Sequence, residues 1–200
     1  QPKPYHAMDV QAVAFDLDGT LAETQVRFTP FRERLNCEER DVLQYIDGLD
    51  EVERQRCRRV LDDYEDSILK DCTTPSGMHD LLQFLAERDI KTGIVTRASG
   101  RHARQVAKKL DIPINVIVGR EDAPPKPSGA PLRLLAHRLD VPPQEMLFIG
   151  DFLWDLLAGQ NAGTPTVLLI NEHNHNADYR DLADYTINNL GELKDLIERP

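Results

Sequence analysis

Two aspartates separated by a single residue, Asp16 and Asp18, are the first side chains of this sequence that can do chemistry together. They lie at the end of an apolar run, Val10 to Leu17, and are followed by Gly19, where the lack of a Cβ allows a sharp exit. Alternate side chains of a strand share a face, so both carboxylates can enter one pocket. Neighbouring carboxylates repel each other, and a hard divalent cation such as Mg²⁺ relieves that repulsion. The alternative is an ordinary Asp-Gly turn.

A second pair of acids, Asp151 and Asp155, follows another apolar run, Met146 to Gly150. Asp151 stands at the end of this candidate strand. Asp155 opens the next helical segment, where a carboxylate favours the helix N-terminus, so it could be a helix cap and nothing more. If the two apolar runs belong to one sheet, the second pair of acids completes a metal cluster with the first.

Two further residues, Thr96 and Lys126, are suited to holding an anion. Thr96 ends a candidate strand before a helical segment, where negative charge is favoured. Lys126 stands between two prolines, which stiffen the loop and let the ammonium project at low entropic cost. Each residue alone is common in strand ends and linkers. Their order along the chain, between the two acidic pairs, indicates an anion site.

The hydrophobic pattern predicts the elements that must position these side chains. The candidate strands are Val10 to Leu17, Ile90 to Thr96, Asn115 to Gly119, Met146 to Gly150, Pro165 to Ile170 and the weaker Tyr185 to Ile187. Helical periods run from Met78 to Leu85, Ala103 to Leu110 and Leu132 to Leu139. Strands that alternate with single helices predict an α/β fold, a Rossmann-like doubly wound parallel sheet with helices on both faces. The carboxyl edge of this sheet would bring the two acidic pairs, Thr96 and Lys126 together.

The segment after the first strand departs from this alternation. Residues 21–75 carry helical patterns at 31–35, 38–46 and 51–69 and no convincing strand. We expect a small helical cap here, inserted into an α/β core formed by residues 10–20 and 76–200. Because it follows the first strand directly, the cap would cover the carboxyl ends of the strands as a lid. Residues 1–9 are polar and contain prolines, and we expect a flexible tail.

Composition excludes several classes of protein. The 24 Lys and Arg residues and 34 Asp and Glu residues give a net charge of −10, which disfavours nucleic acid as a partner. No apolar run approaches the roughly 20 residues that span a bilayer, so we expect no membrane insertion. The three cysteines form no CxxC pair, which indicates a reducing compartment, the cytoplasm by default.

Taken in order, the motifs resemble those of the haloacid dehalogenase-like (HAD) hydrolase superfamily. Motif one corresponds to Asp16-Leu17-Asp18-Gly19-Thr20, motif two to Thr96, motif three to Lys126 and motif four to the segment Gly150 to Asp155. The resemblance runs from about residue 10 to the C-terminus. The helical cap after motif one is similar to that of the phosphoglycolate phosphatase-like branch.

The resemblance implies roles for these residues. The implied catalytic residues are Asp16 as nucleophile, Asp18 as general acid and base, Thr96 and Lys126. The implied phosphate contacts are Asp18, Gly19, Thr96, Arg97 and Lys126. The implied Mg²⁺ ligands are Asp16, Asp18 through its backbone carbonyl, Asp151 and Asp155, the last as a direct or water-mediated ligand or as an orienter of Lys126. Arg97 departs from the Asn or Ser that members often carry, and is either a phosphate contact or a surface residue.

We therefore expect a Mg²⁺-dependent phosphatase that hydrolyses a small phosphorylated metabolite through an aspartyl-phosphate, as a monomer or homodimer. A phosphomutase of the β-phosphoglucomutase type is an alternative, but it requires a cap that retains a bisphosphate. Cleavage of a carbon–halogen bond needs no acid for a leaving oxygen, so Asp18 disfavours it. A catalytically silent binding module on the same fold is the remaining alternative. Phosphoglycolate, sugar phosphates and nucleotides all remain open as substrates.

Two histidines, His173 and His175, follow the fifth candidate strand. They could form a pair of metal ligands. They stand in a polar loop, however, and we expect both to be exposed to solvent.

Overall fold

The computed structural model describes residues 9–24, 28–35, 37 and 41–198, so the predicted flexible tail lies outside the described residues except for Asp9. Its centre is a parallel sheet of six strands in the order β3-β2-β1-β4-β5-β6. The strands are β1 (Ala12–Phe15), β2 (Lys91–Val95), β3 (Ile117–Val118), β4 (Met146–Gly150), β5 (Thr166–Leu169) and β6 (Tyr185–Ile187). This confirms the doubly wound α/β sheet expected from the sequence.

Four of the six strands, β1, β2, β3 and β5, are shorter than the apolar runs that predict them, whereas β4 and β6 have the predicted bounds. β1 is buried along its whole length, as a strand covered on both faces must be. Leu17 lies beyond the strand and is equally buried, because the chain turns into the core after Phe15. Burial therefore extends the apolar pattern past the last hydrogen-bonded pair of the ladder.

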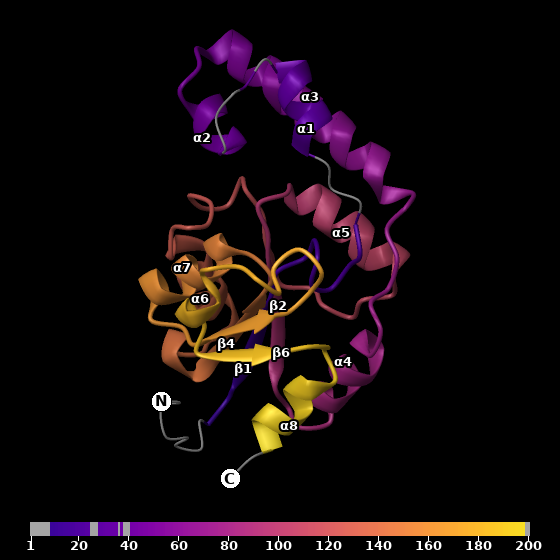
Figure 1. Cartoon of the computed structure of the whole chain (residues 1–200), viewed down its shortest axis with the longest axis vertical. Coiled ribbons are helices and arrows are strands. Elements are labelled where there is room, and N and C mark those ends of the chain that lie inside the picture. Colours follow the sequence, from indigo (N-terminus) through magenta and orange to yellow (C-terminus); the bar gives the residue numbers. More distant parts are fainter. Residues whose placement is uncertain (1–8, 25–27, 36, 38–40, 199–200) are drawn as a thin grey trace.

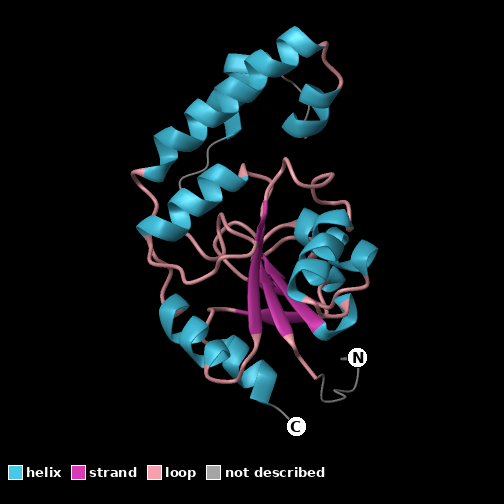
Figure 2. Ribbon diagram, turned by 180° about the vertical axis from the view of Figure 1, so that it is seen from behind, coloured by secondary structure: helices cyan, strands magenta, loops and turns pink. Residues whose placement is uncertain are grey.

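Helices cover both faces of the sheet (Figure 2). The larger core cluster takes apolar side chains from α4 (Met78–Ala86), α5 (Gly100–Lys109) and α8 (Glu192–Glu198). The cluster on the other face takes them from α6 (Ala130–Leu139) and α7 (Leu153–Ala162). Two short 3₁₀ helices, η1 (Pro143–Glu145) and η2 (Arg180–Leu182), precede β4 and β6. Among the described residues, no helix is both long and apolar enough to span a membrane.

Three helices, α1 (Phe28–Leu35), α2 (Val42–Asp47) and α3 (Glu51–Leu69), lie between β1 and α4. They stand over the end of the sheet to which the strands point (Figure 1), and a small apolar cluster of their own includes Leu35, Ile46 and Cys57. The predicted helix at 51–69 has these bounds. The one predicted at 38–46 is α2, which begins at Val42, while residues 38–40 lie outside the described part. We call these helices the cap; Glu23, before them, and Thr73, after them, pair in one isolated antiparallel bridge.

Strand register aligns the ends of the central strands. Phe15 of β1 pairs with Ile94 of β2 and with Ile149 of β4. The residue after each strand therefore emerges at the same edge, and Asp16 still donates its amide to the carbonyl of Ile149 at 2.8 Å. Because the strand order reverses beside β1, this edge is a topological switch point, where open α/β sheets bind ligands.

Candidate active site

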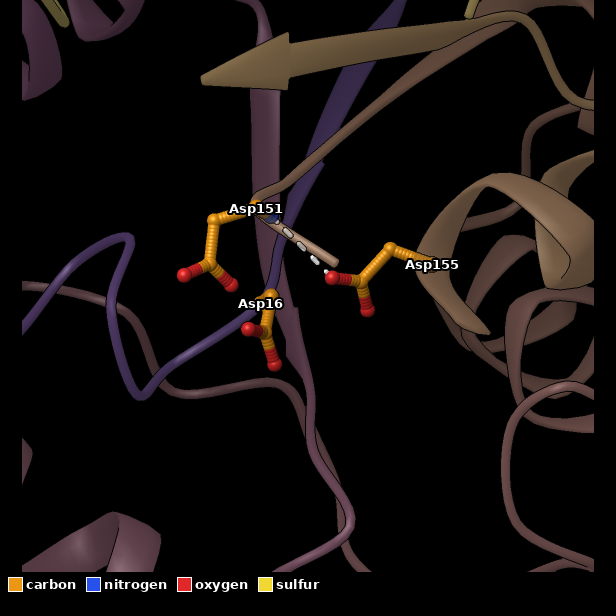
Figure 3. A group of neighbouring side chains, drawn as sticks. All are labelled: Asp16, Asp151 and Asp155. Atoms are coloured by element: carbon orange, nitrogen blue, oxygen red, sulfur yellow. Dashed lines mark hydrogen bonds between the residues drawn. The ribbon is translucent and has the colours of Figure 1, made fainter. Parts of the chain in front are cut away.

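Three carboxylates meet at the carboxyl edge of the sheet. Asp16 follows β1, Asp151 follows β4 and Asp155 lies in the first turn of α7. One oxygen of each lies within 4.8 Å of the others (Figure 3). Residues separated by more than a hundred positions in the chain are thus brought together by strand register and by the short turn between β4 and α7.

Lys126 lies within this group of acids. Its ammonium donates hydrogen bonds to Asp16 at 2.8 Å and to Asp155 at 2.6 Å, and it lies 3.3 Å from the carbonyl of Val95. The lysine is 3% exposed. A buried ammonium needs such partners, because an unpaired charge in this position would be costly.

Asp155 holds two segments of the site at once. One oxygen accepts the hydrogen bond from Lys126, and the other accepts the backbone amides of Asp151 and Phe152, each at 3.1 Å. The carboxylate thus both stabilises the N-terminal turn of α7 and orients the lysine. Its ligation of a metal remains a prediction.

The charges change one another's proton affinity. Burial and the Asp155 charge raise the pKa of Asp16 well above its usual value, against the opposing effect of Lys126. Burial and the same Asp155 charge raise the pKa of Asp151 to about 7. Burial alone would lower the pKa of Lys126, but Asp155 and Asp16 outweigh it and raise that pKa. The site is therefore short of positive charge, as a site for a cation would be.

The turn after β1 brings Gly19 against Asp151. Gly19 has φ +81°, in the left-handed region, and a Cβ there would lie 2.4 Å from an oxygen of Asp151. Both the backbone conformation and the space exclude a side chain. The glycine predicted from the sequence thus lets the first acidic motif approach the second.

Asp18 has partners different from those of the three carboxylates. Its side chain accepts a hydrogen bond from Thr24 at 2.9 Å and is not part of the described acidic group. Burial raises the pKa of Asp18, an effect that His102, Thr24 and Lys126 partly oppose. The two carboxylates of the first motif therefore have different surroundings, and ligation of a metal by Asp18 stays a prediction.

Thr96 and Arg97 lie at the end of β2. Thr96 is buried, donates its amide to the carbonyl of Val118 and accepts the amide of Ala98 on its hydroxyl. The guanidinium of Arg97 is engaged by groups of the protein, including the carbonyl of Lys126. It is neither a plain surface residue nor an open anion ligand, and its predicted contact with phosphate stays a prediction.

Two asparagines that hold Asp151 in place were not predicted from the sequence. Asn171 donates to the carboxylate of Asp151 at 3.1 Å, and Asn174 donates to the carbonyl of Asp151 at 2.8 Å. These asparagines also bond to one another's backbone after β5, a local pattern typical of asparagine-rich turns. His173 and His175, in the same loop, are exposed as predicted.

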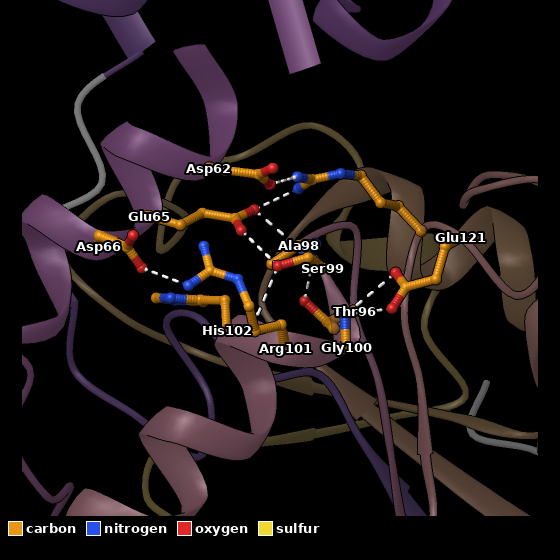
Figure 4. Close-up of polar contacts among 11 residues, drawn as sticks. Asp62, Glu65, Asp66, Thr96, Ala98, Ser99, Gly100, Arg101, His102 and Glu121 are labelled. Atoms are coloured by element: carbon orange, nitrogen blue, oxygen red, sulfur yellow. Dashed lines mark hydrogen bonds and ion pairs between the residues drawn. The ribbon is translucent and has the colours of Figure 1, made fainter. Parts of the chain in front are cut away.

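The cap is held to the core through the turn that follows Thr96. Glu65 of α3 is buried and accepts hydrogen bonds from the amide of Ser99 at 3.2 Å and from its hydroxyl at 2.6 Å. The same carboxylate pairs with Arg120, and beside it Asp66 pairs with Arg101 at 2.9 Å. Figure 4 shows this group of acids on α3 facing the N-terminus of α5.

The donor set of the site fits a hard divalent cation. Its groups are carboxylate oxygens, the ligands that Mg²⁺ prefers, whereas softer metals prefer sulfur or imidazole ligands. Gly19 removes the one Cβ that would crowd the Asp151 oxygens. The raised pKa values of Asp16 and Asp151 indicate that their ionised forms are disfavoured here, and a cation would stabilise those forms.

Comparison with known proteins agrees with this geometry. A family model described as haloacid dehalogenase-like hydrolase matches residues 10–163. An uncharacterized hydrolase of Saccharomyces cerevisiae is 32% identical over 94% of this chain and 91% of its own length. The pyrophosphatase PpaX of Bacillus cereus is 30% identical over 80% of this chain and 82% of its own.

Among solved structures, a predicted phosphoglycolate phosphatase from Haemophilus somnus is similar in fold. It superposes with a TM-score of 0.74 at 19% identity, covering 95% of this chain and 99% of its own. At this identity the likeness concerns the fold, and it includes both the sheet and the helices of the cap region.

Proposed function

The chain belongs to the haloacid dehalogenase-like hydrolases, and from this premise we propose that it is a Mg²⁺-dependent phosphatase of a small phosphorylated metabolite. One observation carries the proposal. Asp16, Asp151 and Asp155 lie together at the switch point of the sheet, and the ammonium of Lys126 bridges Asp16 and Asp155. A nucleophile, a cation site and a fixed positive charge are the parts that phosphoryl transfer needs.

Asp16 is the nucleophile of the proposal. Its carboxylate oxygen attacks phosphorus, the bond from phosphorus to the ester oxygen breaks, and an aspartyl-phosphate forms. Lys126, 2.8 Å away, holds this carboxylate in one orientation and neutralises charge on the transferred group. Water then attacks the phosphorus, and the bond to Asp16 breaks to release phosphate.

Asp18 is the general acid and base. As the ester bond breaks it gives its proton to the leaving oxygen, and it takes a proton from the water that attacks the intermediate. Its raised pKa supports the protonated form that the first step requires. The hydrogen bond from Thr24 would hold the Asp18 carboxyl group in one orientation during both steps.

Thr96, Gly19 and Lys126 would hold the oxygens of the transferred phosphoryl group. Thr96 offers a buried hydroxyl in the turn after β2. The amide of Gly19 donates to the carbonyl of Ala22 at 2.9 Å, so it would have to exchange this bond for one to phosphate. Phosphoryl transfer depends mainly on the positions and charges of the groups around the phosphate. The carboxyl edge of the sheet would keep these three residues in fixed positions.

Asp16, the backbone carbonyl of Asp18, and Asp151 would hold the Mg²⁺, with Asp155 as an outer or direct ligand. When bound, the cation neutralises the carboxylates and phosphate oxygens. Asn171 and Asn174 keep Asp151 in place for this task. Asp155 meanwhile orients Lys126, so the acidic group and the ammonium are set by one network.

The substrate is a small phosphate compound that fits beneath the cap. The pyrophosphatase at 30% identity makes pyrophosphate a compound to test, and the fold neighbour makes phosphoglycolate another. We place the protein in the cytoplasm, as a monomer or homodimer, with no nucleic-acid or membrane partner. All three cysteines are buried thiols, which supports a reducing compartment.

The test compares wild-type protein with Asp16→Asn on p-nitrophenyl phosphate, pyrophosphate and a panel of phosphate esters, with Mg²⁺ and with EDTA. We expect Mg²⁺-dependent turnover that falls about a thousandfold or more in the variant. Asp111→Asn is the control, because Asp111 is exposed and Asn tolerates its positive φ of 52°. Equal turnover by wild type and Asp16→Asn would refute the proposal.

A further inference from the structure

Arg97 joins three segments of the protein through one guanidinium group. It donates to the main-chain carbonyl of Lys126 and pairs with the carboxylate of Asp41. Its guanidinium carbon also lies over the ring of Trp154, 4.0 Å from the ring centroid. The lysine loop, the cap and the start of α7 therefore meet on this one side chain.

The pair of Arg97 with Asp41 is largely removed from solvent. The two side chains are 18% and 21% exposed. Burial lowers the pKa of Arg97, and the charges of Asp41, then Asp155 and Asp16, oppose that effect. The guanidinium thus interacts electrostatically with the acids of the active site. Loss of the Asp41 charge should affect these acids more than the loss of an exposed ion pair would.

Asp41 fixes the start of α2 as well as Arg97. It is the N-cap residue of α2, and its carboxylate accepts the amides of Leu43 and Gln44, both at 3.1 Å. This helix stands over the carboxyl edge of the sheet (Figure 1). The carboxylate that begins the helix is therefore the same group that contacts the core.

The cap holds the turn after β2 at two positions. Asp41 of the α2 end binds Arg97, and Glu65 of α3 binds Ser99 two residues further on. Glu65 also pairs with Arg120, so α3 has an anchor of its own. The cap thus contacts this turn through α2 and, separately, through α3.

We propose that Arg97 is a positioning residue that couples the docking of α2 to the placement of Lys126. The inference rests on the proposed function, because the position of the Lys126 ammonium affects catalysis only if the protein is a phosphatase. With α2 docked, Asp41 fixes the guanidinium and the guanidinium fixes the lysine carbonyl. With α2 displaced, both contacts weaken, and the ammonium that bridges Asp16 and Asp155 is less well placed. A simple phosphate ligand at Arg97 would not depend on Asp41.

Asp41→Asn, Arg97→Lys and the double variant test this coupling. Asparagine is as good an N-cap as aspartate, so Asp41→Asn keeps α2 and removes only the charge toward Arg97. Lysine keeps the charge of Arg97 but lacks the planar fork that reaches two acceptors. Asp50→Asn is the matched control, because Asp50 caps α3 in the same way, through the amide of Glu53, and exposes its side chain to solvent.

Two measurements are made on each variant, the steady-state constants for p-nitrophenyl phosphate at saturating Mg²⁺ and amide hydrogen exchange. We expect Asp41→Asn and Arg97→Lys each to lower kcat about tenfold with little change in KM. The double variant should resemble Arg97→Lys alone, since all three variants weaken the same interaction between Arg97 and Asp41. Asp41→Asn should also speed exchange in residues 42–47 and around the lysine, at the amides of Lys126, Ser128, Gly129 and Ala130. Asp50→Asn should leave both constants and the lysine loop unchanged.

The coupling is wrong if Asp41→Asn and Asp50→Asn behave alike in kcat and in exchange around Lys126. It is equally wrong if Arg97→Lys raises KM while Asp41→Asn has no effect, which is the behaviour of a direct phosphate ligand. If wild-type protein has no phosphatase activity, the proposed function fails by itself. The exchange of these amides around Lys126 still decides whether α2 and the lysine loop are coupled.

Discussion

The ammonium of Lys126 lies 2.6 Å from the carboxylate of Asp155, and both groups are almost fully buried. The same ammonium contacts Asp16, the predicted nucleophile, on its other side. Positive charge is therefore held between two acids that would otherwise repel each other. Both the stability and the chemistry of the site depend on that arrangement.

Replacement of Lys126 by Met leaves Asp16 and Asp155 buried without their counter-charge. We expect kcat/KM for p-nitrophenyl phosphate to fall about a thousandfold and the free energy of unfolding to fall by about 3 kcal/mol. Lys91→Met is the control, since the ammonium of Lys91 binds the carbonyl of Leu139 at 2.6 Å, away from the site. Urea unfolding and steady-state kinetics measure the two effects. A Lys126→Met protein as active as Lys91→Met contradicts the account.

Replacement of Gly19 by Ala places a methyl group against Asp151. We expect turnover at a fixed Mg²⁺ concentration to fall about a hundredfold, because the carboxylate must move. Gly163→Ala separates this clash from backbone strain, since Gly163 has a similar positive φ of 71° but nothing within 4 Å of the added Cβ. Both variants should lose about 1 kcal/mol of stability, and only Gly19→Ala should lose affinity for Mg²⁺ in calorimetry. Equal Mg²⁺ affinity in the two variants refutes this.

The pKa of about 7 for Asp151 predicts a pH dependence. Between about pH 4 and pH 7 the folded, metal-free protein keeps a proton on this group that the unfolded chain has lost, so its stability falls as pH rises across that range. Mg²⁺ must displace the proton, and its affinity should rise about fivefold from about pH 6 to pH 7. Calorimetry in two buffers of different ionisation enthalpy measures the proton release. An affinity for Mg²⁺ that does not change with pH would show that Asp151 is ionised before the metal binds.

Glu65 anchors the cap, and its loss should be costly. Glu65→Ala leaves Arg120 paired with Asp62 alone of its two carboxylate partners, and it removes the acceptor of the buried Ser99 amide and hydroxyl. We expect a loss of about 3 kcal/mol in the free energy of unfolding. Asp66→Ala removes a neighbouring pair with Arg101 that is exposed on both sides, and should cost less than about 1 kcal/mol. Urea unfolding of the two variants makes the comparison. Similar losses for both would mean that Glu65 is not an anchor.

The sequence predicted the part of the site that backbone topology determines. Asp16, Thr96 and Asp151 each follow a strand of one parallel sheet, so their meeting at the carboxyl edge follows from the order of the strands. The bounds of the long helix α3 and of β6 were also predictable from periodicity and flanking residues. Strand β1 was predicted too long because burial continues beyond its hydrogen bonds.

The residues that hold the site in place were not predictable in the same way. Thr24 and Asn171 act through side-chain hydrogen bonds from loops, whose paths depend on packing rather than on local pattern. Asp41 and Glu65 belong to the cap, and their sequence neighbourhood marks them only as a helix cap and a charged helix face. Their contacts with Arg97 and Ser99 arise only once the cap lies over the core.

The central claim is that Asp16 carries the phosphoryl group. A single turnover with Mg²⁺ and p-nitrophenyl phosphate is stopped with acid within milliseconds, treated with borohydride and examined by peptide mass spectrometry. We predict that Asp16, and no other residue, is reduced to homoserine, because borohydride reduces an acyl phosphate but not a free carboxylate. An unmodified Asp16 in protein that turns over this substrate, or homoserine at another aspartate, would contradict the account.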